Sequence, residues 1–184
     1  MKHITNFGQW LNEALAPVPD TMIEDGLEIV DGLVARGFDS KVAAALAGNM
    51  WQESKFKPDV RPKTAPYVGL VQWGSPGGRK QKLISKPDWH TLDAQLDYVK
   101  QEFDTIPTFK SMLPTVQAAP TLQKAAEIVA RKYEGCADPT NPNRLNSAAQ
   151  LYTAWQASQA APTPTQVEPQ IDDTEFGEPA TTIN

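Results

Sequence analysis

Glu53 is the residue whose position most strongly suggests acid chemistry. It follows the alanine-rich run AAALAGNMW, at the point where a helix is expected to end. The small side chains of that run allow the helix to pack inside a core, which would place Glu53 at an interior edge. The negative end of the helix dipole and the nearby rings of Trp51, Phe56 and Trp73 favour a protonated carboxyl. Such a carboxyl can act as a general acid; the competing interpretation is a solvated residue on a surface helix.

The segment YVGLVQW, residues 67–73, supplies groups that suit a carbohydrate ligand. Gly69 permits a close approach of the backbone. Gln72 offers a neutral donor and acceptor for sugar hydroxyl and N-acetyl groups, and the rings of Tyr67 and Trp73 can pack on sugar rings. We therefore expect a carbohydrate cleft next to the acid.

Helices must position these groups. Apolar residues at helical spacing, with capping residues and proline or glycine at the ends, predict seven helices. The density of proline and glycine between Lys55 and Gly78 excludes a helix of useful length there, and we expect a short strand or an extended wall at residues 67–73. The fold is thus mainly α. The predicted helices cover residues 22–36, 41–52, 79–84, 92–103, 107–113, 121–133 and 142–156.

The chain divides into three parts. Residues 1–20 are expected to form an N-terminal extension with an amphipathic element at residues 7–15, and residues 21–159 a single domain. Residues 160–184 form an acidic tail, rich in proline and threonine, that cannot bury enough surface to fold alone. The tail is either disordered or lies on a partner, in which case the candidate anchors are Ile171, Phe176 and Ile183.

The distribution of charge argues against nucleic-acid binding. The chain has 22 acidic and 17 basic residues, and the tail contains 5 of the acidic ones, which leaves 17 of each sign elsewhere. A nucleic-acid footprint needs a basic face. No apolar run approaches the roughly 20 residues that a membrane span requires. The N-terminus does not look like a secretory signal, so we expect delivery by another route if the protein works outside a cytoplasm.

Cysteine and histidine are too rare for a zinc site. Cys136 is the single cysteine, which excludes an intrachain disulfide, and His3 and His90 lie far apart in sequence. No local motif activates Cys136, which we interpret as a bystander thiol rather than a nucleophile. We expect neither a metal nor a cofactor.

Two segments resemble the phage tail lysozyme family, which comprises peptidoglycan-cleaving domains of tail-tip or virion proteins: GNMWQESKFKPD and YVGLVQWGSPGGRKQKL. They are also similar, more distantly, to soluble lytic transglycosylases and goose-type lysozymes, which share a Glu-Ser pair at a helix end and a Gly-Leu-Met-Gln-like segment. The resemblance extends over about residues 22–155. It implies a lysozyme-like, mainly α, α+β fold with an irregular or short β segment after the catalytic helix.

The resemblance also implies roles for individual residues. Glu53 matches the catalytic acid and Ser54 a serine that hydrogen-bonds near it, while Trp73 retains its expected stacking role. Val68, Lys57 and Val71 depart from the pattern of the relatives, and Val68 puts the role of Tyr67 in doubt. The remaining matches are to substrate-binding or cleft-lining positions: Gly69, Leu70, Gln72, Arg79, Tyr133 and Glu134.

The bond that the resemblance implies is the β-1,4 link between N-acetylmuramic acid and N-acetylglucosamine. Hydrolysis in the usual scheme needs a second carboxyl group, whereas a lytic transglycosylase needs only one. The two routes stay open at this point, with a preference for hydrolysis. The candidates for the second carboxyl are Asp59, Asp93, Asp97 and Glu134.

The partners that the resemblance implies are bacterial peptidoglycan and other virion proteins, the latter through residues 160–184. The protein would then reside in the virion and act in the host cell envelope. Three other hypotheses remain: a structural virion protein of lysozyme-like fold with little activity, a free host-lysis endolysin, and a bacterial wall-remodelling enzyme. The last would normally need an export signal.

Overall fold

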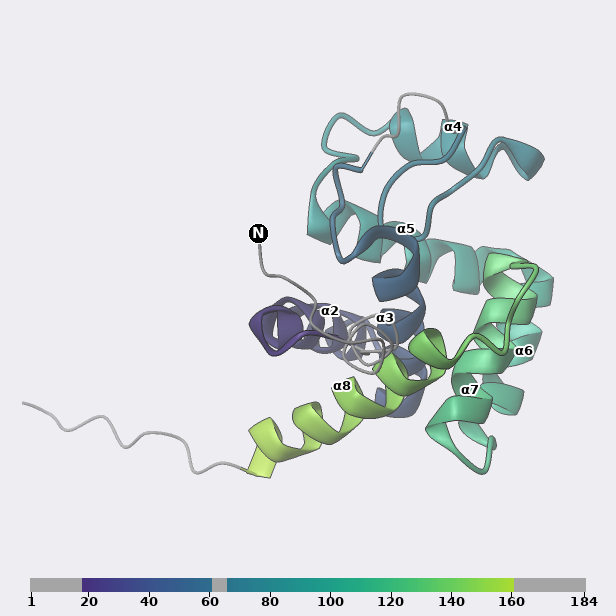
Figure 1. Cartoon of the computed structure of the whole chain (residues 1–184). Coiled ribbons are helices and arrows are strands. Elements are labelled where there is room, and N and C mark those ends of the chain that lie inside the picture. Colours follow the sequence, from purple (N-terminus) through teal and green to yellow (C-terminus); the bar gives the residue numbers. More distant parts are fainter. Residues whose placement is uncertain (1–17, 61–65, 161–184) are drawn as a thin grey trace, which may run out of the picture.

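Helices dominate the structure, a computed structural model that describes residues 18–60 and 66–160 (Figure 1). The predicted mainly helical, lysozyme-like fold is confirmed. The amphipathic element at residues 7–15 and the proposed anchors in the tail lie outside the described residues. The elements are η1 (Asp20–Met22), α2 (Ile23–Ala35), α3 (Ser40–Ser54), η2 (Pro76–Gly78), α4 (Arg79–Ile84), α5 (Leu92–Thr105), α6 (Pro107–Gln117), α7 (Leu122–Val129), η3 (Ala130–Glu134) and α8 (Pro142–Ala160).

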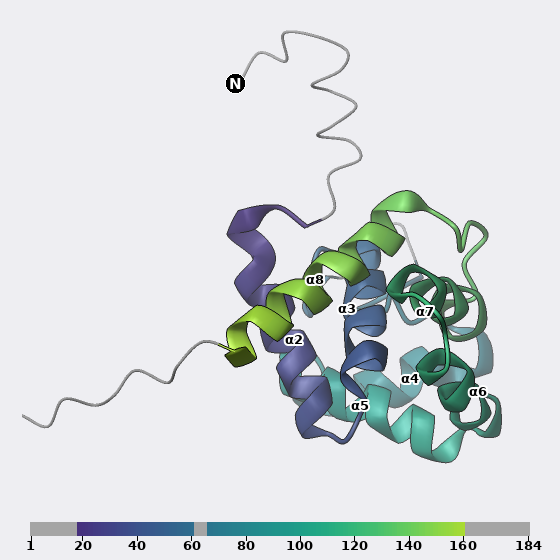
Figure 2. The ribbon, with the colours of Figure 1, turned by 90° about the horizontal axis from the view of Figure 1, so that it is seen from below.

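Helix α3 is the centre of the domain. It packs against α2, α6, α7 and α8, and every residue from Val42 to Trp51 is buried. Figure 2 shows α8 passing over α2 and α3. The crossing of α3 and α8 is close because of Gly48, where a side-chain carbon would lie 2.5 Å from the backbone nitrogen of Ala148. The small residues of α3 thus let a neighbouring backbone approach the helix that carries Glu53.

The segment between α3 and α5 forms the other part of the fold. In Figure 1 it lies with α4 above α5, at the opposite end of the molecule from α8. The strand predicted for residues 67–73 is reduced to an isolated antiparallel bridge between Val68 and Trp73. The intervening residues form a turn, in which Gly69 O accepts a hydrogen bond from Gln72 N. Within the described residues this bridge is the sole β pairing.

Two predicted helices differ from the observed ones where the site is built. Helix α3 continues two residues beyond its predicted end and includes Glu53, because Lys55 adopts the left-handed conformation that ends it. The predicted helix at residues 121–133 is regular only as far as Val129 and then continues as the π-helical turn η3. Both differences concern the residues that deliver carboxyl groups.

Candidate active site

Glu53 lies in the last turn of α3 and lines a cavity of about 360 Å³. Its side chain is 23% exposed. The helix end therefore places this carboxyl at an interior edge, as the small side chains of α3 indicate. The other residues around the cavity come from the loop after α3, from the end of η3 and from the segment that follows it; they are Tyr67, Val71, Gln72, Glu134, Gly135, Cys136 and Ala137.

An arginine from the first turn of α8 holds Glu53. Arg144 Nη2 lies 2.7 Å from Glu53 Oε1, and only 5% of the arginine side chain is exposed. The expected surroundings of Glu53 were apolar, with the rings of Trp51 and Phe56 beside it. In the structure those two rings pack on each other, with centroids 5.1 Å apart, and the carboxyl has a cationic partner that the sequence analysis did not foresee.

Asn49 fixes the other end of the same guanidinium. Arg144 Nη1 donates to Asn49 Oδ1 at 2.5 Å. The amide nitrogen of Asn49 donates to the carbonyl oxygens of Ala45 and Ala126, at 2.7 and 3.2 Å. Asn49 is fully buried. These bonds connect α3, α7 and α8 directly behind Glu53.

The π-helical turn η3 brings Glu134 to the same cavity. The N–H groups of Gly135 and Cys136 both donate to Ala130 O, which are i+5 and i+6 spacings and widen the last turn of the helix. Gly135 has φ +66 and stops it. A π turn re-aims the side chains that follow it and is frequent at functional sites. Here it points Glu134 into the space next to Glu53.

The two carboxyl groups interact strongly. Burial raises the pKa of Glu134 well above its usual range, and the Glu53 carboxylate raises it further. The cations Arg144 and Arg79 oppose this rise. Glu134 Oε1 is buried and has no hydrogen-bond partner. The cavity therefore contains a carboxyl whose protonated form is favoured, next to one that is paired with an arginine.

The turn at residues 69–72 places Gln72 at the cavity. The side-chain amide of Gln95, a buried residue of α5, holds the backbone of this turn. It accepts a hydrogen bond from Leu70 N at 2.7 Å and donates one to Pro58 O at 2.6 Å. Gly69 has φ +73, and a side-chain carbon there would lie 2.6 Å from Gln95 Oε1. Glycine is therefore required at this position, for its left-handed backbone as well as for space.

Backbone strain gathers around the cavity. Three non-glycine residues in the described ranges have positive φ: Lys55, Phe56 and Gln72, at 56°, 61° and 52°. Lys55 and Phe56 directly follow α3, and Gln72 lines the cavity. Each such residue costs roughly 1–2 kcal/mol, and strain of this kind concentrates at functional sites. Its position is an observation independent of the carboxyl groups.

Arg79 belongs to a second hydrogen-bond network, which is centred on Glu102. Its guanidinium forms two bonds to Glu102 of α5, from Nε to Oε1 at 2.6 Å and from Nη2 to Oε2 at 2.9 Å. Glu102 Oε2 also accepts from Trp73 Nε1 at 3.0 Å and from the Tyr133 hydroxyl at 2.7 Å. Arg79 Nη1 donates to Tyr133 O. This network joins α4, α5 and η3 in the interior.

The structure differs here from what the sequence analysis expected of Trp73, Tyr133 and Arg79. Trp73 is 1% exposed and Tyr133 is 2% exposed, so neither ring has a free face for a sugar. Arg79 lies against the ring of Tyr133 instead of reaching the cavity. The physical reason is Glu102, a buried carboxylate that supplies an acceptor to all three side chains.

Ser54 and Leu70 also face inward. The Ser54 hydroxyl is buried and donates to Met50 O within α3. Leu70 is fully buried and contributes its backbone N–H to Gln95. Neither lines the cavity. Among the residues matched by resemblance, the structure thus brings together Glu53, Gln72 and Glu134, while Gly69 shapes the turn that carries Gln72.

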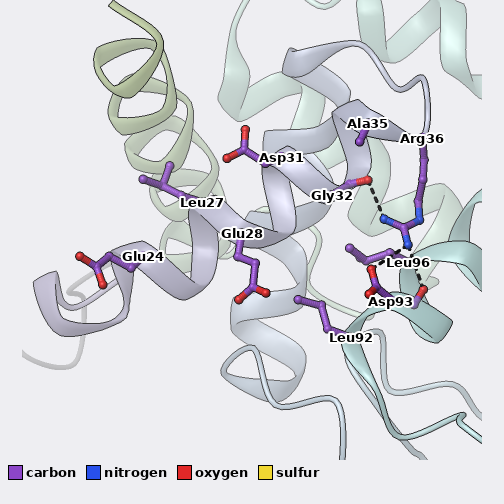
Figure 3. A pocket seen from close by; sticks show the side chains of 10 residues that line it. All are labelled: Glu24, Leu27, Glu28, Asp31, Gly32, Ala35, Arg36, Leu92, Asp93 and Leu96. Carbon is purple, nitrogen blue, oxygen red and sulfur yellow. Dashed lines mark hydrogen bonds and ion pairs between the residues drawn. The ribbon is translucent and has the colours of Figure 1, made fainter. Parts of the chain in front are cut away.

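The other carboxyl candidates lie elsewhere. Asp93 and Asp97 pair with Arg36, at 3.0 and 2.7 Å. Figure 3 shows Asp93 and Arg36 in a groove between α2 and α5, apart from the Glu53 cavity. Asp59 borders a third hollow, with Phe56 and Leu92. Glu134 is the candidate that shares a cavity with Glu53.

Cys136 borders the cavity too, and burial raises the pKa of its thiol. A raised pKa opposes the thiolate that a nucleophile needs. Within residues 18–60 and 66–160, no group of three or more His, Cys, Asp or Glu side chains could hold a metal ion. In the same ranges, no helix combines the length and apolar character needed to cross a membrane.

Arg144, Asn49, Gln95 and Glu102 are the residues that the sequence analysis missed. One signal was available for two of them. Asn49 is a polar residue within the apolar run of α3, and Glu102 follows Val99 on the apolar face of α5. A polar residue on a buried face must find a partner, but nothing in the sequence identifies that partner.

Comparison with known families identifies the family of this chain. The family model described as phage tail lysozyme matches residues 25–155, which include Glu53, Gln72, Glu134 and Arg144. No curated relative matches the sequence. The predicted resemblance is confirmed, and since the match extends over most of the chain, this protein belongs to the phage tail lysozyme family, whose function is lysozyme-like degradation of peptidoglycan.

Proposed function

We propose that the protein is a muramidase that hydrolyses the β-1,4 bond between N-acetylmuramic acid and N-acetylglucosamine. One observation carries this proposal: Glu53 and Glu134 line the same cavity. Hydrolysis of a glycosidic bond in the usual scheme uses two carboxyl groups. A lytic transglycosylase needs one, so the presence of the second favours hydrolysis.

The pair supplies one proton and one carboxylate. Burial and mutual repulsion oppose a doubly ionised pair, and the raised pKa of Glu134 favours the retention of one proton in the cavity. In the reaction that proton goes to the bridging oxygen, whose bond to the anomeric carbon breaks. Water then supplies a hydroxyl to that carbon and returns a proton to the pair.

Within this pair, Glu53 is the carboxyl that meets the bridging oxygen and acts as the catalytic acid. Its side chain is 23% exposed, whereas Glu134 Oε1 is buried. Glu134 holds the proton of the pair in the resting protein and passes it to Glu53, which delivers it to the bridging oxygen. Gln72 and Tyr67 line the same cavity and are the residues that contact the sugar; Tyr67 is 46% exposed.

Muropeptide analysis tests the reaction. Wild-type protein is incubated with purified peptidoglycan, and the released fragments are analysed by mass spectrometry. We expect reducing muramic ends. Anhydro-muramic ends would replace the hydrolase by a transglycosylase, and no release from several wall types would favour a structural protein of lysozyme-like fold.

Two substitutions test the assignment of the pair. We expect Glu53→Gln to reduce the release of muropeptides at least ~100-fold, since removal of a positioned proton-transfer group has effects of about 10²–10⁴-fold. We expect Glu134→Gln to reduce it strongly as well, because the amide cannot hold the proton. If Glu134→Gln retains full activity, the two-carboxyl mechanism is wrong and Glu53 works alone.

We also propose that the protein is carried in the virion, where it acts locally on the host wall during infection, with residues 160–184 as the segment that contacts other virion proteins. The acidic, proline-rich composition of that segment supports this role. Deletion of residues 160–184 should leave wall cleavage nearly unchanged and weaken incorporation into particles. Mass spectrometry of purified virions provides the test, and absence of the full-length protein from particles would favour a free endolysin.

A further inference from the structure

Arg144 is a buried cation that binds two side chains of α3. Its Nη2 lies 2.7 Å from Glu53 Oε1, and its Nη1 donates to Asn49 Oδ1 at 2.5 Å. Asn49 and Glu53 are four residues apart on α3 and therefore lie on the same face of the helix. A guanidinium is a rigid, planar fork of donors, so fixing one branch on Asn49 also fixes the direction of the other toward Glu53.

The platform behind this fork is rigid. The amide of Asn49 is tied to the carbonyl oxygens of Ala45 and Ala126, which belong to α3 and α7. Gly48 lets α8 approach α3 closely, with Ala148 at the crossing. The position of Arg144 relative to Glu53 is therefore set by the packing of three helices.

This arrangement is poor as a device for stability. Arg144 stands in the first turn of α8, where the helix dipole disfavours a cation. Its Nε is buried without a hydrogen-bond partner. A buried ion pair is often replaced by apolar residues without loss of stability. Stability therefore does not explain why a buried arginine stands at this position. Its bond to Glu53 does, because it sets the geometry and the charge around that carboxyl.

We infer that Arg144, held by Asn49, is a positioning residue for the proposed reaction: it fixes the Glu53 carboxyl through Oε1 and leaves Oε2 to the substrate. This inference rests on the proposed function. Arg144 does not touch the reacting atoms; it acts through Glu53.

Charge gives this role a signature that a packing role lacks. The ionisable groups close to Arg144 are Glu53 and Lys55 at the end of α3, and Glu134 and Cys136 at and after η3; the cation Arg79 also acts on Glu134. Arg144 opposes the raised pKa of Glu134. Loss of this cation leaves Glu134 facing Glu53 without Arg144 to oppose their repulsion, so Glu134 prefers the protonated form more strongly and the pH profile of activity moves to higher pH.

The test uses Arg144→Met and Arg144→Lys, with Arg36→Met as a matched control outside the cavity. Initial rates of muropeptide release from soluble glycan fragments give kcat and KM across pH, and thermal unfolding reports the fold. We expect Arg144→Met to lower kcat by about 100-fold, since misplacement of a catalytic group by 1 Å has effects of that order. We expect its KM to change much less and its pH profile to move to higher pH.

Arg144→Lys retains the charge but not the fork. We expect its pH profile to stay near that of the wild type and its kcat to lie between those of the wild type and Arg144→Met. We expect Arg36→Met to retain the wild-type kcat and pH profile. If Arg144→Met does not fold, Arg144→Lys decides alone, because a single ammonium cannot hold Asn49 and Glu53 in the same geometry.

Folded Arg144→Met or Arg144→Lys with the wild-type kcat overturns the inference. A fall in kcat that is equal at every pH in Arg144→Met also overturns it, since that result indicates packing alone. In both cases an active wild type and an inactive Glu53→Gln leave the proposed function standing. A wild type that releases no muropeptides removes the proposed function and this inference together.

Discussion

Two arginine–glutamate pairs join helices through residues that are far apart in sequence, and they differ in what surrounds the carboxyl. In the Arg79–Glu102 pair the carboxyl is sealed in the interior, while 21% of the arginine side chain is exposed. Both carboxyl oxygens of Glu102 are used, with two bonds from Arg79 and one each from Trp73 and Tyr133. Glu102 is 2% exposed and lines none of the cavities described above.

The Arg144–Glu53 pair opens onto a cavity. A single bond at 2.7 Å joins the two side chains. Polar atoms around it lack partners, namely Arg144 Nε and Glu134 Oε1. A second carboxyl with a raised pKa lies in the same cavity. The backbone on either side contains the left-handed residues Lys55, Phe56 and Gln72.

The comparison teaches how to recognise the functional pair. A buried ion pair that serves the fold has its hydrogen-bonding groups satisfied, because unpaired polar atoms in an interior are costly. A pair that serves chemistry leaves groups free for a ligand and tolerates strain nearby. Substitutions at the sealed pair should therefore alter stability, and substitutions at the open pair should alter activity.

The largest effect on stability is expected at the sealed pair. Arg79→Met leaves Glu102 buried without its cation, and breaking a buried pair in this way costs about 3–5 kcal/mol of unfolding free energy. Urea unfolding measures the loss. The folded fraction should lose much less of its muropeptide release than Arg144→Met does, because Arg79 does not line the cavity. A loss of less than about 1 kcal/mol would show that this network is not the structural pair we describe.

A smaller, pH-dependent effect is expected at the open pair. The pKa of Glu134 is raised in the folded protein, so the folded state binds more protons than the unfolded state above the ordinary glutamate pKa of about 4.3. Wild-type stability should therefore fall as the pH rises from there toward the folded pKa. Glu134→Gln removes this decline, so its stability relative to the wild type should rise by up to ~1.4 kcal/mol per pH unit in that window.

Urea unfolding at several pH values between 4 and 8 measures this difference. Glu127→Gln is a useful control, because the pKa of Glu127 is lowered by its hydrogen bonds to Lys124 and Arg131. The stabilisation by Glu127 is fully present above the ordinary glutamate pKa, so Glu127→Gln should be less stable than the wild type by an amount that does not vary with pH above that value. A difference between wild type and Glu134→Gln that does not vary with pH would contradict the raised pKa.

Backbone strain next to the open pair predicts an effect of about 1 kcal/mol. Gln72 has φ 52, a conformation that favours glycine. Gln72→Gly and Gln72→Ala both lose the amide, so they differ mainly in this strain. We expect the glycine variant to be more stable by about 1 kcal/mol and both variants to be less active than the wild type. Equal stability of the two would show that Gln72 is unstrained.

The smallest effect is expected at an exposed ion pair. Lys100 and Asp104 pair within α5, and the Asp104 side chain is 57% exposed. Exposed pairs of this kind contribute at most about 0.5 kcal/mol. Asp104→Asn should therefore leave urea unfolding and activity within error of the wild type. If Asp104→Asn loses as much unfolding free energy as Arg79→Met, the contribution of an ion pair to stability does not depend on its burial in this protein.

Much of the fold could be predicted from the sequence, because it depends on local patterns. The apolar spacing and end signals located the helices, and the small residues of α3 placed it in the core. The family was also predictable, since the segments around Glu53 and Gln72 are close in sequence to the family's pattern.

The partners of the carboxyl groups could not be predicted. Arg144 lies 91 residues from Glu53 in sequence, and Tyr133 lies 31 residues from Glu102. Neither contact leaves a local pattern. The same is true of η3, since the periodicity of residues 121–133 fits an ordinary helix and gives no sign of the wider turn that aims Glu134.

Trp73 shows how a reasonable expectation goes wrong for the same reason. An aromatic residue near a predicted acid is consistent with sugar stacking. In the structure its indole N–H donates to Glu102, a residue 29 positions away, and its ring is buried. Aromatic residues are more often buried in a core than exposed in a cleft, and only the partner of the indole distinguishes the two.

The most direct test of the difference between the two pairs compares Glu53→Gln with Glu102→Gln. Each protein is assayed for muropeptide release per folded molecule and for its unfolding free energy in urea. We expect Glu53→Gln to keep wild-type stability within about 1 kcal/mol and to lose at least ~100-fold in muropeptide release, and Glu102→Gln to lose stability and keep its activity. Wild-type muropeptide release by a folded Glu53→Gln protein would contradict the central claim that Glu53 is the catalytic carboxyl.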